Sequence, residues 1–152
     1  MGVRRFGMAD TTTLSIDHAR QIIAGALAER AAAGMNPLCV VVVDAGGHVV
    51  ALEREDGVPY GRVEVASGKA QGAIAIGPNS RKLGDMAVER PHFVGAVVAA
   101  MGGAVVPVAG GVVIVDANGS RIGAAGASGD TSDNDEQAVL AGIAAAGLSA
   151  QA

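Results

Sequence analysis

Apolar residues recur with helical spacing near both ends of the chain. Between Leu14 and Ala33 they lie three or four positions apart, which predicts an amphipathic helix with Thr13 or Ser15 as its N-cap. A second helix is expected over residues 133–148. Its N-cap would be Ser132, and the acidic residues in its first turn complement the helix dipole.

Two strand–turn–strand units lie between these helices. In the first, the β-branched run 38–44 and the weakly alternating run 48–54 flank a glycine pair. In the second, residues 105–108 and 112–116 precede an Asn-Gly turn, and residues 120–127 follow it. Asn-Gly between apolar runs is a strong hairpin signal. Both units therefore predict antiparallel strands.

Three further helices are expected between the two units, over residues 62–76, 80–90 and 91–101. The first of them contains Gly68 and Gly72, each of which costs about 1 kcal/mol relative to alanine in a helix interior. Close packing of this helix against the sheet or a ligand would compensate for that cost.

The order helix, hairpin, helices, hairpin, helix predicts an α+β domain. We expect an antiparallel sheet of about five strands, built from two hairpin units, with helices covering one face. A parallel, Rossmann-type sheet fits this order less well. Residues 13–152 would form the single domain, preceded by a flexible leader over residues 1–12 in which Met8 is an alternative start to Met1.

Composition narrows the possible partners. The net charge is −4, and no Lys/Arg cluster is interleaved with aromatic residues, which argues against nucleic acid. No apolar run approaches the ~20 residues that span a bilayer. The single cysteine, Cys39, lies in an apolar run and cannot form an internal disulfide. It is expected to be a buried small hydrophobe, and a cytoplasmic location is compatible with it.

Few local motifs indicate chemistry. The three histidines, His18, His48 and His92, share no metal-ligand spacing, although His92 stands out because it begins a helix beside an aromatic residue. The acidic run 130–136 lacks the glycine and the final carboxylate of a calcium loop. The glycine pairs match no nucleotide-binding motif. The small polar loop 128–131 could present backbone N–H groups to an anion.

Lys69 is the most conspicuous charged residue. The flanking positions 66, 68, 70 and 72 are all alanine or glycine, so its stem would be closely surrounded and its ammonium would be directed into a cleft or toward a partner. A lysine in that position could bind a carboxylate, or act as a base if desolvation lowered its pKa. A solvated surface lysine is the equally weighted alternative.

A series of short motifs in this order and spacing resembles the GlcG/HbpS family, also called the haem-degrading or DUF336 domain. The chain is similar as well to the C-terminal domain of PduO-type cobalamin adenosyltransferases. The resemblance covers residues 13–148. The motifs are VDAGGHVVALER at 43–54, Asp56-Gly57, SGKA at 67–70, PVAGGV at 107–112, the segment 123–129 and Asp135-Glu136.

The resemblance implies a profilin-like α+β fold, homo-oligomers and, for some relatives, haem binding. Others occur in catabolic operons. The family's lysine corresponds to Lys69 and its glycine-rich strand to Gly110 and Gly111. A small-ligand site would then be lined by these residues with Tyr60, Ser128 and Thr131. Haem is a possible cofactor, with His92 or His18 as candidate iron ligands and Tyr60 and Met101 as further donors.

Three hypotheses follow. The leading one is a cytoplasmic, oligomeric protein that binds haem or a related tetrapyrrole. The second is a cofactor-independent isomerase or hydrolase acting on a small oxo- or hydroxy-acid, in which Lys69 binds the carboxylate and Glu53, Asp130 or His92 is the general acid or base. The third is a non-catalytic accessory subunit.

Overall fold

The computed structural model describes residues 13–152, so the leader expected over residues 1–12 and the alternative start at Met8 lie outside the described part. The helices and strands follow the expected order, except that residues 105–108 form no strand and a short strand follows the last helix. The elements are α1 (Ile16–Ala32), β1 (Cys39–Asp44), β2 (Val49–Arg54), α2 (Arg62–Ile76), α3 (Ser80–Glu89), α4 (Pro91–Ala100), β3 (Gly111–Val115), β4 (Arg121–Ser128), α5 (Ser132–Ala145) and β5 (Ser149–Ala150).

The strands form one antiparallel sheet in the order β2-β1-β4-β3-β5. Each predicted hairpin pairs its own two strands. The two hairpins then join along the whole length of β1, which pairs with β4 from Cys39–Ser128 to Asp44–Gly123. The prediction of an α+β domain with a five-stranded antiparallel sheet is confirmed. The two-residue strand β5 at the edge was not predicted.

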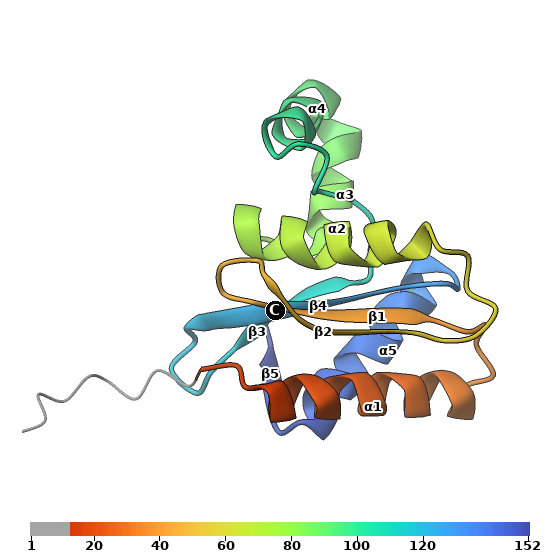
Figure 1. Ribbon diagram of the computed structural model, residues 1–152. Coiled ribbons are helices and arrows are strands. Elements are labelled where there is room, and N and C mark those ends of the chain that lie inside the picture. The colour runs from red at the N-terminus through yellow and green to blue at the C-terminus, as the bar shows by residue number, and fades with distance from the viewer. Residues whose placement is uncertain (1–12) are drawn as a thin grey trace, which may run out of the picture.

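Helices cover both faces of the sheet, as Figure 1 shows: α2 lies above it, and α1 and α5 lie below it. Strand β1 is buried on both sides. Val40 and Val42 belong to the core with α1 and α5, whereas Cys39, Val41 and Val43 pack with α2. The expectation that helices cover one face is wrong, because an uninterrupted apolar strand needs cover on both sides.

The segment 105–108, expected to be a strand, instead crosses α2. Its backbone bonds to the helix, since the N–H of Val106 donates to the carbonyl oxygen of Gly68 at 3.1 Å. A Cβ at Gly68 would lie 2.6 Å from a methyl group of Val106, and one at Gly72 would lie 3.0 Å from Val105. The helical glycines are therefore explained by close packing of this segment. Its proline provides no N–H for a sheet ladder.

Side chains cap the first and last helices. The hydroxyl of Ser15 accepts from the backbone N–H of His18 at 3.0 Å, and the His18 imidazole accepts in return from the N–H of Ser15 at 3.3 Å. Ser15 is thus one of the two predicted caps. Helix α5 is capped by Thr131, which accepts from Asn134, and not by the predicted Ser132. Ser132 is already helical, one residue inside the boundary.

Helices α3 and α4 project from the body beyond α2 (Figure 1). Only Val94 of α4 is buried, although the helix is almost entirely apolar or small. Val88 at the end of α3 is 85% exposed. None of the helices within residues 13–152 has the length and apolar character needed to cross a membrane.

Candidate functional site

A buried ion pair connects the two faces of the sheet. Lys69 lies in the middle of α2, and its ammonium donates to the carboxylate of Asp135 on α5 at 2.9 Å and to the carbonyl oxygen of Ala127 at 3.0 Å. The two side chains are 3% and 2% exposed. A Cβ at Gly110 would lie 2.8 Å from the ammonium, so glycine is what leaves room for it there.

Apart from Tyr60, the other residues predicted to line a small-ligand site lie around this pair. A side chain at Gly111 would overlap the carbonyl group of Lys69. The Ser128 hydroxyl accepts from the Arg62 guanidinium at 3.2 Å. The backbone N–H of Asp130 donates to Asp135 at 3.0 Å, and Thr131 caps the helix that carries Asp135. Helix α2 therefore approaches residues 110 and 111 closely.

Asp135 is the centre of this cluster and was not predicted as a site residue. Its only sequence signals are its position in an acidic helix start and in a family motif. Burial raises the pKa of Asp135, while the hydrogen bond and charge of Lys69 and the N–H of Asp130 oppose the rise. The pKa of Asp130 is lowered, chiefly by the backbone N–H of Asn36 and then by Thr131.

Lys69 lines none of the three cavities described here. Its ammonium already faces an internal carboxylate, and both groups are buried. A carboxylate from an external ligand would have to displace Asp135. The role of Lys69 in binding a substrate, on which the enzyme hypothesis depends, stays a prediction.

The remaining predicted residues lie apart from the cluster. Glu53 on β2 lines a cavity of 580 Å³ next to Arg54. Tyr60 is 81% exposed. His92 is exposed in the first turn of α4, and His18 is half-buried at the start of α1. Residues 13–152 contain no group of three or more His, Cys, Asp or Glu side chains placed to hold a metal ion.

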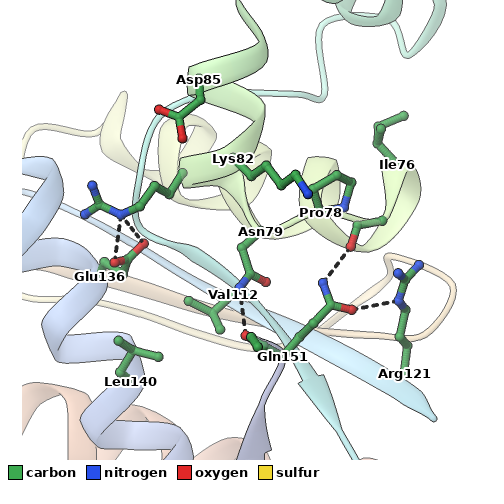
Figure 2. A pocket seen from close by; sticks show the side chains of 13 residues that line it. Ile76, Pro78, Asn79, Lys82, Asp85, Val112, Arg121, Glu136, Leu140 and Gln151 are labelled. Carbon is green, nitrogen blue, oxygen red and sulfur yellow. Dashed lines mark hydrogen bonds and ion pairs between the residues drawn. The ribbon is translucent and has the colours of Figure 1, made fainter. Parts of the chain in front are cut away.

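The largest of the three cavities, at 740 Å³, contains none of the predicted site residues. It lies where the end of α2, the start of α3, β3 and α5 meet the last residues of the chain (Figure 2). Its wall includes Lys82 and Asp85 of α3, Val112 of β3, Leu140 of α5 and Gln151. These residues come from distant parts of the sequence, so no local motif could have identified them.

The protein is thus an α+β domain whose antiparallel sheet is covered by α2 on one face and by α1 and α5 on the other (Figure 1). Helices α3 and α4 project from this body. The family model described as haem degrading protein HbpS-like matches residues 14–144. The chain therefore belongs to the HbpS-like family. No curated protein matches the sequence.

Solved structures agree with this assignment. A structure of a PduOC–haem complex superposes with a TM-score of 0.82 at 25% identity, covering 93% of this chain and all of that one. A structure of HbpS gives 0.75 at 25% identity, covering 95% and 97%. The DUF336 protein ORFY of Klebsiella pneumoniae gives 0.80 at 19% identity, covering 97% and 98%, and shares the fold.

Proposed function

We propose that this protein binds haem or a related tetrapyrrole. The observation that carries the proposal is the likeness to PduOC, a relative solved as a haem complex, over 93% of this chain. Membership of the HbpS-like family over residues 14–144 supports the same ligand class. A tetrapyrrole supplies its own four nitrogen ligands, so one protein side chain is enough to anchor its iron.

We propose His92 as that side chain. Its imidazole is exposed, and no hydrogen bond or ion pair within residues 13–152 holds it. The exposed face of α4 continues from His92 through Gly95, Ala96 and Ala99. A Cβ at Gly95 would meet no atom within 4 Å. An imidazole beside an open surface of small residues is compatible with a flat macrocycle lying along the helix.

His18 is the alternative ligand. Its Nδ1 accepts from the backbone N–H of Ser15 in the helix cap, so its Nε2 would have to bind the iron. Replacing His18 removes part of the cap as well, whereas His92 makes no such contact. Replacing His18 should therefore lower the stability of the protein, whereas replacing His92 should not.

Hemin added to the purified protein is expected to give a Soret band that saturates. Saturation should occur at no more than one hemin per protein chain. Iron-free protoporphyrin should bind more weakly, because it cannot form the axial bond that iron makes to imidazole. Absorbance titration in parallel with both macrocycles measures the difference. A band that grows linearly without saturating, as hemin gives when it partitions nonspecifically, would rule out the proposed function.

We also propose that the protein is a homo-oligomer assembled through the α3–α4 pair. Val88 of α3 is 85% exposed, Val108 beside α3 is 41% exposed, and the apolar helix α4 has a single buried residue. Sedimentation equilibrium should find a mass above one chain that Val88→Glu lowers. A monomeric wild-type protein would contradict this.

A further inference from the structure

The 740 Å³ cavity at the start of α3 has features of a second ligand site. We infer that it binds a small organic monocarboxylate with an apolar body, held by Lys82 and Arg121. The site is distinct from the exposed face of α4 and does not depend on haem binding. The inference rests on its size, its apolar wall and the two cations at its rim.

The size and the wall suit a small molecule. Ligand sites in proteins generally have volumes of about 300–1,000 Å³ and are lined mainly by apolar side chains around a few polar groups. Here the apolar part is formed by Ile76, Pro78, Val112 and Leu140. Val112 is fully buried in the sheet, whereas Leu140, which lines the cavity, is 41% exposed. A hydrocarbon group placed there would cover it.

Arg121 is held in place by the chain around it. Its Nε donates to the side-chain oxygen of Gln151 at 2.9 Å, and the Gln151 amide donates to the carbonyl oxygen of Gly77 at 2.8 Å (Figure 2). A Cβ at Gly77 would lie 3.0 Å from an Nη atom, so glycine gives the guanidinium its space. The Nη groups remain available as the forked donors that match a carboxylate. Gln151 is thus a positioning residue.

Lys82 differs from its neighbour Arg81 in the charges around it. Arg81 is neutralised by Asp133 at 2.5 Å and Glu136 at 3.0 Å. No ion pair within residues 13–152 involves Lys82, whose side chain extends from α3 toward Pro78 (Figure 2). Of the three cations that line the cavity, two therefore remain free to meet an anion.

The charges also limit the ligand to one negative group. Asp85 lines the cavity one turn along α3 from Lys82 and forms no ion pair within the described residues. A second carboxylate near it would be repelled. Leu140 lies across the cavity from Arg121 (Figure 2), so the preferred ligand places its single carboxylate between Lys82 and Arg121 and its hydrocarbon against Leu140.

The test is an NMR titration of the full chain with benzoate, with benzylamine as a probe of the same shape and opposite charge. Benzoate is expected to shift the amide signals of the cavity wall saturably, and benzylamine is not. Lys82→Gln and Arg121→Gln should each weaken benzoate binding by about tenfold, because each removes a charged hydrogen bond. Arg20→Gln, at an exposed cation of α1 outside the cavity, is the matched control and should change nothing.

Leu140→Glu, an exposed substitution that adds a negative charge at the wall, should also abolish the benzoate shifts. Shifts outside the wall, equal shifts with benzylamine, or wild-type affinity in the Lys82→Gln/Arg121→Gln variant would each overturn the inference. Hemin titration of that variant is expected to match the wild type. Failure at this cavity is thereby distinguished from failure of the proposed haem binding.

Discussion

Replacing Lys69 with methionine is expected to lower the free energy of unfolding by about 3–5 kcal/mol, since it leaves the Asp135 carboxylate buried without its counter-ion. Both side chains are almost fully buried, and the ammonium also satisfies the carbonyl oxygen of Ala127. Urea denaturation at neutral pH, followed by circular dichroism, measures the loss.

Two further variants test whether the loss of stability in Lys69→Met comes from the unpaired buried charge and not from substitution in general. Arg81→Gln breaks exposed ion pairs with Asp133 and Glu136 and should cost no more than about 1 kcal/mol. The double variant Lys69→Met/Asp135→Leu should lose far less than the two single variants together, because no uncompensated charge remains. If Lys69→Met were as stable as Arg81→Gln, the buried Lys69–Asp135 ion pair would not be needed for the stability of the fold.

The loss in Lys69→Met should depend on pH. Burial already raises the pKa of Asp135 above its ordinary value, and removing Lys69 raises it further. A carboxyl group whose pKa is higher in the folded state adds stability below its unfolded pKa, and loses that contribution as the pH rises through the folded pKa. The destabilisation should therefore be smallest in acid and grow toward neutral pH, which denaturation at several pH values will show.

Gly142→Ala is expected to destabilise the protein by about 3 kcal/mol through overpacking. Gly142 lies on α5 where it crosses α1, and an added Cβ would overlap the carbonyl oxygen of Ile22 and lie 3.1 Å from the backbone nitrogen of Ala26. The obstacle is backbone, so no side-chain rotation can relieve it. The two helices would have to move apart and open the core between them. Thermal and urea unfolding measure the effect.

Gly95→Ala is the matched control, because it makes the same change in a helix where the new methyl group meets no atom within 4 Å. It should raise the free energy of unfolding by up to about 1 kcal/mol, the difference in helix propensity. Equal effects of the two substitutions would show that the α1–α5 contact is looser than described.

Local patterns predicted most of the fold because they act over a few residues. The spacing of apolar residues placed α1, and the Asn-Gly turn placed the hairpin of β3 and β4. The segment 105–108 was wrongly predicted as a strand because its β-branched residues favour one. In the structure it packs instead on the glycines of α2. This packing is a tertiary contact, which a local sequence pattern does not reveal.

The site was predicted only in part for the same reason. Lys69 was conspicuous because its helical neighbours are so small, and that observation correctly indicated tight surroundings. Its partner Asp135 is 66 positions away, and the acidic helix start already explained a carboxylate there. Lys82 on α3 and Arg121 on β4 line one cavity only in the folded chain, so no spacing in the sequence connects them.

The most direct test of haem binding at α4 compares the hemin spectra of three variants, in each of which one histidine is replaced by alanine. His92→Ala should shift the Soret band and weaken binding, whereas His48→Ala, which removes another exposed histidine, should bind as the wild type does. His18→Ala should leave the spectrum unchanged and lower stability slightly through the lost cap. A wild-type spectrum and affinity in His92→Ala would contradict the assignment of His92 as the iron ligand.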